Sequence, residues 1–182
     1  MIKYSEIKKI MDRSSYEINM PLNQIEKWLE GVKEDYGLEL NPDYQRGNVW
    51  TEEQQIAFVE YMLRGGNSSM VIYFNCPQFE MGSCDRIKNA DKLPMQCLDG
   101  LQRLTAIRKF VNNELPVFNG NYLDDFEDKE VILSCLTDLK FNVNNIQTKK
   151  EIIQWYLDYN SAGTYHTKEE IERVKKLLEE CE

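Results

Sequence analysis

The stretch of residues 95–112 constrains the fold of this chain more than any other part of the sequence. Met95-Gln-Cys-Leu98 is typical of a short buried strand, and it runs through Asp99-Gly100 directly into an amphipathic helix. The apolar positions of this helix fall on one side of a helical wheel and are Leu101, Leu104, Ile107 and Val111. The stretch therefore predicts a strand, a tight turn and a helix that buries one side.

Three other helices are predicted from a shared start signal, a threonine followed three residues later by Glu or Gln. Such a pair forms a capping box, in which two side chains satisfy backbone N–H groups at the start of a helix. The pairs are Thr51 with Gln54, Thr148 with Glu151, and Thr167 with Glu170. Apolar residues at helical spacing follow each pair, and the same spacing predicts a helix from Asn23 towards Gly37.

Short strands are predicted between these helices, over residues 16–20, 69–75, 95–98, 115–118 and 140–146. Helices and short strands alternate along the chain, which predicts an α+β (mixed α/β) fold class. A chain of 182 residues can bury a core without disulfides or a structural metal, so we expect residues 1–182 to form a single domain.

The charge of the chain bears on its partners. With 31 acidic and 22 basic residues, the net charge is −9. Affinity for DNA comes largely from neutralised phosphates, so DNA is a possible partner that the acidic charge does not favour. A compact anion such as a nucleotide needs only a few positive groups, and the overall charge does not count against it.

The cysteines and the apolar content predict a cytoplasmic protein. The five cysteines are odd in number and scattered, and none form a Cys-x-x-Cys pair, which indicates reduced thiols. No stretch approaches the ~20 apolar residues of a membrane span, and the N-terminus lacks the apolar region of a signal peptide. We expect no membrane association.

The strand-to-helix turn is the first candidate site. A helix start offers unpaired N–H groups and the positive end of the helix dipole, which together attract anions. Arg103 can grip two phosphate oxygens, and Gly100 lets the backbone approach a ligand closely. Asp99 can hold Mg²⁺ or orient a water molecule. The alternative is structural, with Asp99 capping the helix, Gly100 making the turn and Arg103 lying in solvent.

Two further segments turn this site into a recognisable pattern. Pro42-Asp-Tyr-Gln-Arg46 precedes Trp50, and Asn160-Ser-Ala-Gly163 lies between two predicted helices. Together with Asp99-Gly-Leu-Gln-Arg103, they resemble the ParB-like domain at the N-terminus of GmrSD-type modification-dependent restriction enzymes. That family shows Pro-x-(Tyr/Phe)-Gln-Arg-x-x-x-Trp, Asp-Gly-Gln-Gln-Arg and Asn-x-Gly-Gly in the same order. The resemblance spans about residues 16–178, and the chain looks especially like the stand-alone versions of this domain that bacteriophages and prophages carry.

The resemblance implies a ParB/sulfiredoxin-like fold, a small mixed sheet flanked by helices. It also implies that a nucleoside triphosphate binds at the Asp-Gly-x-Gln-Arg corner, often with hydrolysis and with Mg²⁺. The roles it implies are phosphate contact for Arg46 and Arg103, close approach for Gly100, and polar orientation for Gln45 and Gln102. By the same resemblance, Asp99 holds the metal or acts as general base, and Gln102 is the second catalytic residue. Asn160 and His166 close the site from the turn that follows.

The chain departs from the family pattern at two positions and leaves two alternatives open. Leu101 replaces the first Gln of the central motif, and Ala162 replaces a glycine of the late turn. With His166 as the single histidine, the chain cannot assemble the metal site of an HNH nuclease.

An NTPase that acts as a switch is the favoured function. The alternatives are a metal-dependent DNA nuclease or nickase that uses Asp99, and a non-catalytic phage accessory protein that binds a host protein.

Overall fold

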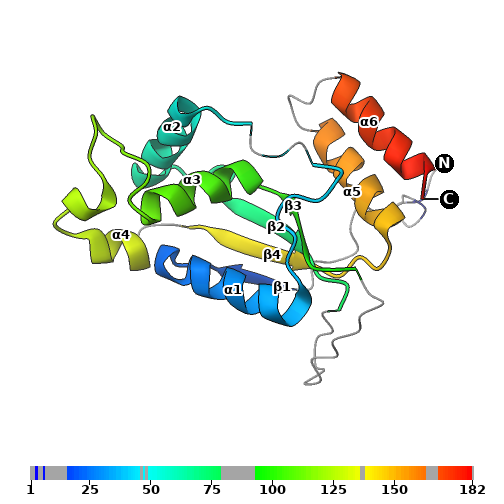
Figure 1. Cartoon of the computed structure of the whole chain (residues 1–182), viewed down its shortest axis with the longest axis horizontal. Coiled ribbons are helices and arrows are strands. Elements are labelled where there is room, and N and C mark those ends of the chain that lie inside the picture. Colours follow the sequence, from blue (N-terminus) through cyan, green and yellow to red (C-terminus); the bar gives the residue numbers. More distant parts are fainter. Residues whose placement is uncertain are drawn as a thin grey trace.

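A four-stranded mixed sheet forms the centre of the protein (Figure 1). The computed structural model describes residues 3, 6, 16–45, 47, 49–78, 93–135, 138–162 and 168–181. The strands are β1 (Tyr16–Asn19), β2 (Val71–Asn75), β3 (Gln96–Asp99) and β4 (Lys140–Asn144), in the order β1-β4-β2-β3. β4 and β2 are parallel, whereas β1 pairs with β4 and β2 with β3 in antiparallel fashion.

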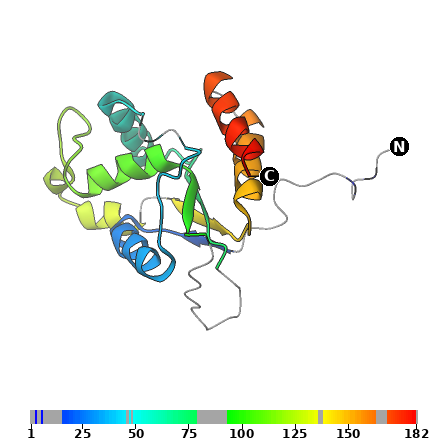
Figure 2. The ribbon, with the colours of Figure 1, turned by 45° about the vertical axis from the view of Figure 1, so that its right-hand side comes forward.

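The helices of the described residues form two groups around this sheet (Figures 1 and 2). The first group is α1 (Ile25–Tyr36), α2 (Glu52–Leu63), α3 (Leu101–Val111) and α4 (Lys129–Cys135). The second is the hairpin of α5 (Lys149–Ala162) and α6 (Lys168–Glu179), which lie side by side. Short 3₁₀ turns cover Leu22–Gln24 and Leu123–Asp125. Together with the sheet, these helices confirm the predicted α+β class. Within the described ranges, no helix is both long and apolar enough to cross a membrane.

Side-chain alternation along the strands creates two apolar clusters. Phe74 of β2 and Phe141 of β4 face the first helix group, where Trp28 of α1 packs against both rings at centroid distances of 5.0 and 4.8 Å. The neighbouring Tyr73 instead packs on Trp155 of α5, which is 2% exposed. β2 is therefore covered by helices on both faces.

The predicted helix starts agree with the structure wherever it describes them. Thr51 and Gln54 form a complete capping box, with bonds of 3.3 Å to the Gln54 N–H and 2.9 Å from the Thr51 N–H. Thr148 accepts the Glu151 N–H at 3.2 Å, and its own hydroxyl donates to the Glu151 carboxylate at 2.8 Å. Thr167 lies outside the described residues.

The strand predicted over residues 115–118 is wrong. Val117 N–H donates to the Asn121 carbonyl and Asn121 N–H donates to the Val117 carbonyl, both at 2.8 Å, which closes a tight turn. Inside this turn Phe118 and Asn119 take positive φ values of 45° and 67°. The apolar side chains of Leu115 and Val117 are buried by this turn and need no strand partner.

Candidate functional site

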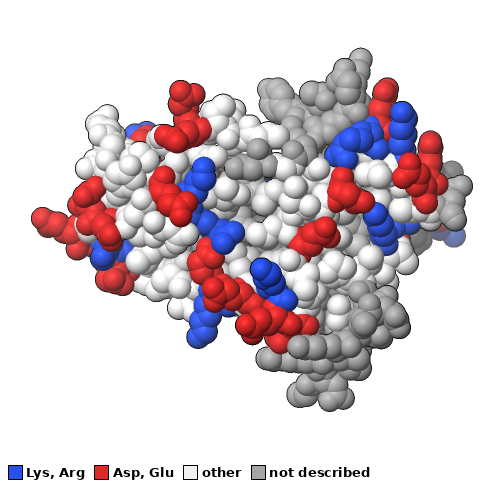
Figure 3. Space-filling model, in the orientation of Figure 1, with Lys and Arg blue, Asp and Glu red and all other residues white. Residues whose placement is uncertain are grey.

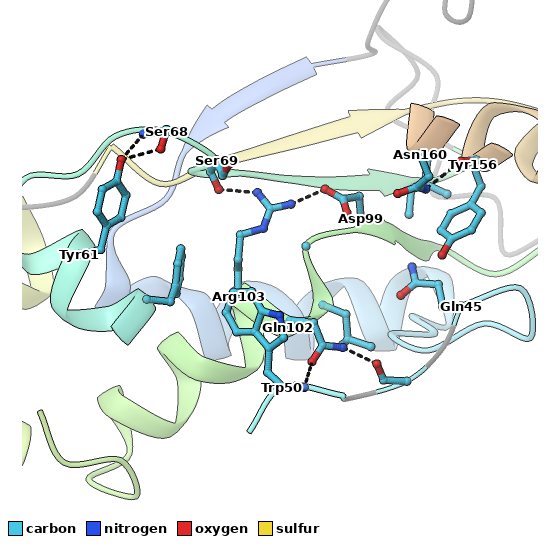
Figure 4. Close-up of a pocket in the computed structure, with 15 residues that line it drawn as sticks. Gln45, Trp50, Tyr61, Ser68, Ser69, Asp99, Gln102, Arg103, Tyr156 and Asn160 are labelled. Atoms are coloured by element: carbon cyan, nitrogen blue, oxygen red, sulfur yellow. Dashed lines mark hydrogen bonds and ion pairs between the residues drawn. The ribbon is translucent and has the colours of Figure 1, made fainter. Parts of the chain in front are cut away.

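A pocket of about 450 Å³ opens where β3 ends and α3 begins (Figure 4). Its walls come from the segment before α2, from α2 and the turn after it, from the β3–α3 corner, and from α5. Six of the eight predicted site residues line it, namely Gln45, Asp99, Gly100, Gln102, Arg103 and Asn160. The other two, Arg46 and His166, lie outside the described residues.

Gly100 is required at the corner by its backbone angle and by its surroundings. Its φ is +98°, in the region that side chains disfavour. A Cβ atom there would lie 2.6 Å from Cδ1 and 3.3 Å from Cα of Ile72, on the neighbouring strand β2. The group that lies close to Gly100 in this structure is strand β2.

The start of α3 has no side-chain cap. Gly100 occupies the N-cap position, and the first helical bond runs from the Leu104 N–H to the Gly100 carbonyl at 2.9 Å. The structural alternative, in which Asp99 caps this helix, is therefore wrong. Because the N–H groups of residues 101–103 precede the first helical bond, they have no acceptor within the helix.

Asp99 pairs with Arg103, one helical turn further along. Arg103 Nη2 donates to Asp99 Oδ2, and Arg103 Nη1 donates to the Ser69 carbonyl and, at 2.9 Å, to the Val71 carbonyl (Figure 4). The Arg103 side chain is only 14% exposed and that of Asp99 25%. Arg103 is therefore not the solvated charge of the structural alternative. It ties the start of α3 to the chain entering β2, with its guanidinium at the pocket wall.

Gln102 is bound to the backbone of the segment before α2. Its Oε1 accepts the N–H groups of Val49 and Trp50 at 3.0 and 3.1 Å, and its Nε2 donates to the Gly47 carbonyl. Both the oxygen and the nitrogen of this amide thus hold Gly47, Val49 and Trp50 against α3 (Figure 4). The predicted orienting role of Gln102 is directed, in this structure, at the protein's own main chain.

Gln45 makes a similar tie to the sheet, and α6 supports it from outside. Gln45 Nε2 donates to the Cys97 carbonyl of β3. Arg173 of α6 donates to the carbonyls of Asp43, Tyr44 and Gln45 at 2.7, 3.1 and 3.3 Å. One guanidinium thus holds three successive carbonyls of the turn that carries Gln45, which links the α5–α6 hairpin to the pocket.

This link predicts that loss of Arg173 loosens the turn at residues 43–45. Arg173→Met is expected to speed amide hydrogen exchange at residues 43–45, since the three carbonyls of this turn lose their shared donor. Lys175→Met on the same exposed helix is the matched control and should leave that segment unchanged. Equal exchange in the two variants would contradict the proposed support.

The third motif, which begins at Asn160, starts on a helix. The polar turn expected between Tyr156 and His166 is helical as far as Ala162, so Asn160 sits in the last turn of α5. Its Nδ2 donates to the Tyr156 carbonyl at 2.8 Å, and both residues line the pocket. Burial, and after it the Asp99 carboxylate, raise the pKa of the neighbouring Tyr159. α5 therefore borders the same pocket as Asp99.

Aromatic residues of the opposite wall were missed from the sequence. Trp50, Phe58 and Tyr61 line the pocket, and none of the three was among the predicted site residues. Ser68 and Ser69, which follow α2, line it as well. The available signal was the place of Trp50 within the first motif, directly before the Thr51 cap.

Cys97 lies two residues before Asp99 but is buried and protonated. Its thiol is 0% exposed, and burial, with the Asp99 carboxylate second, raises its pKa from 9.0 to about 12. A thiol is nucleophilic as the thiolate, so Cys97 is inert at neutral pH.

The raised pKa of Cys97 predicts a loss of stability in alkali. The unfolded thiol ionises near pH 9 while the folded thiol keeps its proton, so its contribution is complete below pH 9 and is lost between pH 9 and 12. We expect the free energy of unfolding to fall by up to about 1.4 kcal/mol per pH unit in this window. Urea unfolding from pH 7 to 10.5 measures this free energy, which should fall less steeply with pH in the Cys97→Ala variant. An identical decline in both proteins would refute the assignment to Cys97.

The pocket fits a nucleotide in size and in donor set. Small-molecule sites measure roughly 300–1,000 Å³, which includes the observed volume. Mg²⁺ bound with phosphates takes one or two protein carboxylates. Asp99 offers one, through Oδ1, the oxygen that the Arg103 bond does not use.

Comparison with known proteins assigns the chain to a family. A family model described as the GmrSD restriction endonuclease, N-terminal domain, matches residues 25–181. No curated protein and no solved structure shows significant similarity to the chain. The matched range contains all three motifs, at residues 42–50, 99–103 and 160–163. The chain belongs to the family of GmrSD restriction endonuclease N-terminal domains.

Proposed function

We propose that the pocket binds a nucleoside triphosphate together with Mg²⁺, and that binding and hydrolysis act as a switch in a process related to restriction. One observation carries the proposal: the uncapped start of α3 opens on a pocket that also holds Arg103 and Asp99. The described Thr caps of α2 and α5 satisfy their helix starts internally. The N–H groups at the start of α3 are instead available to phosphate oxygens.

In this proposal each residue of the corner has a separate task. The N–H groups of residues 101–103 and the Nε–H of Arg103 bind phosphate oxygens. Asp99 Oδ1 holds Mg²⁺ or orients the attacking water. Gln102 and Gln45 act as positioning residues, because their amides bind the backbone at Gly47, Trp50 and Cys97.

The surface charge supports a small anion over duplex DNA. On the face drawn in Figure 3, acidic side chains gather over α1 and around the start of α4, and basic side chains lie interspersed among them. This mixture agrees with the net charge of −9. Neutralising many phosphates requires a continuous basic surface, whereas a nucleotide requires only the local donors of the pocket.

The test is a thermal-shift and calorimetric series with ATP, GTP, CTP, UTP and their diphosphates, each with and without Mg²⁺. A ligand at 100 times its Kd stabilises the fold by about 2.7 kcal/mol, which raises Tm by several degrees. Asp99→Asn should remove the Mg²⁺ dependence, while Arg108→Met, away from the pocket lining, should not. If no nucleotide stabilises the folded protein, the proposal fails. Plasmid nicking that needs Asp99 would then favour the nuclease alternative.

A further inference from the structure

The backbone of Trp50 is held by hydrogen bonds with two glutamine side chains. Its N–H donates to Gln102 Oε1 at 3.1 Å, and its carbonyl accepts from Gln55 Nε2, also at 3.1 Å. Gln55 is only 2% exposed, so the group that binds the Trp50 carbonyl is a buried side-chain amide. The next residue, Thr51, is fixed by the capping box of α2. The backbone of Trp50 is therefore pinned on both sides while its side chain lines the pocket.

The rings beside Trp50 extend it into an aromatic wall. Phe58 packs against Trp50 at a centroid distance of 5.5 Å and an interplanar angle of 58°. Tyr61, one turn further along α2, lines the same side, and its hydroxyl lies 2.5 Å from Ser68 Oγ (Figure 4). The wall thus combines apolar ring surface with two hydroxyl groups at its rim.

The rest of the pocket lining is mainly polar. Asp99, Arg103 and the start of α3 supply charge and N–H donors, Gln45 and Asn160 add amides, and Tyr156 adds one further ring (Figure 4). A nucleotide has the same division, with an anionic chain at one end and a flat aromatic base at the other. Rigid aromatic side chains bind bases by stacking, and such stacking accepts any base because every base has a π-face.

We infer that Trp50, Phe58 and Tyr61 form the nucleobase subsite of the pocket, with Trp50 as the stacking platform. The inference rests on the proposed function and adds the orientation of the ligand, with its phosphates at α3 and its base on the α2 side. Gln102 then serves both ends of the site, since it lies at the start of α3 and fixes Trp50.

The experiment compares binding of the four ribonucleoside triphosphates with binding of inorganic triphosphate, all with Mg²⁺, by calorimetry. Trp50→Leu keeps apolar volume but removes the aromatic face. We expect its Kd for nucleoside triphosphates to rise roughly tenfold, with little change for inorganic triphosphate. Tyr61→Ala, at a side chain that is 42% exposed, is the second variant should Trp50→Leu not fold. Tyr122→Ala, 40% exposed and outside the pocket lining, is the matched control.

The outcomes separate this inference from the proposed function. Selective loss of nucleoside triphosphate binding in the folded variants supports the subsite. If wild type binds nucleotides and the variants keep the full preference over inorganic triphosphate, the subsite is elsewhere and the proposed function stands. Equal affinity of wild type for both ligand classes would also overturn the inference. If wild type binds neither class, the proposed function itself fails.

Discussion

Gly100→Ala is expected to destabilise the protein by about 2–4 kcal/mol, the sum of a strained φ and a steric clash. The φ of +98° disfavours any side chain, and the new methyl group meets Ile72 Cδ1 at 2.6 Å and Ile72 Cα at 3.3 Å. Ile72 is fully buried, so its side chain cannot swing away. Urea unfolding monitored by circular dichroism measures the loss.

Gly120 supplies a control with nearly the same backbone angle. Its φ is +101°, and a Cβ atom there meets nothing within 4 Å, so Gly120→Ala should cost only about 1–2 kcal/mol. Ile72→Val removes Cδ1 and should recover part of the loss when it is combined with Gly100→Ala. Equal effects of the two glycine substitutions would show that the contact with β2 does not matter.

Arg103→Met is expected to lower the free energy of unfolding by about 2–4 kcal/mol, because one carboxylate and two carbonyls lose their hydrogen-bond donor. Asp99 loses its ion pair, and the Ser69 and Val71 carbonyls lose their shared donor. Methionine keeps much of the aliphatic length of arginine, so packing is largely preserved. Equilibrium unfolding in urea gives the change in free energy.

The pair of Arg108 with Glu26 is the matched control. It is bidentate, at 2.5 and 2.8 Å, but its side chains are 35% and 37% exposed. Arg108→Met should therefore cost no more than about 1 kcal/mol. Adding Asp99→Asn to Arg103→Met removes the stranded charge and should restore stability in part. Similar losses for Arg103→Met and Arg108→Met would mean that Arg103 does not carry the tie between α3 and β2.

The elements that sequence predicted well are those set by neighbours in the chain. The Thr51 cap, the turn at Gly100 and the start of α3 depend on residues within about one helical turn. The strand at residues 115–118 failed because Val117 closes a turn with Asn121, and a short apolar run does not reveal whether a partner strand exists. The order of the strands likewise depends on packing between distant segments.

Part of the pocket lining was predicted from the sequence, whereas the hydrogen-bond partners of its side chains were not. Residues 45, 99–103 and 160 meet in one pocket, as the three motifs implied. The partners of Gln102 lie more than fifty positions away, and an amide can bind a ligand or a main chain equally well. The residue type therefore fixed the chemistry of the bond, and only the fold selected its partner. Whether a nucleotide occupies the pocket stays a prediction.

Gln45 and Gln102 bind main-chain atoms, and Arg103 binds the main-chain carbonyls of Ser69 and Val71 in addition to the Asp99 carboxylate. Every residue carries a carbonyl, so a substitution at Ser69, Val71 or Cys97 keeps the acceptor. The donor positions have no such freedom, because few side chains have the required reach and shape. The residues that supply only a carbonyl can therefore vary, whereas Gln45, Gln102 and Arg103 must be kept for these bonds to form.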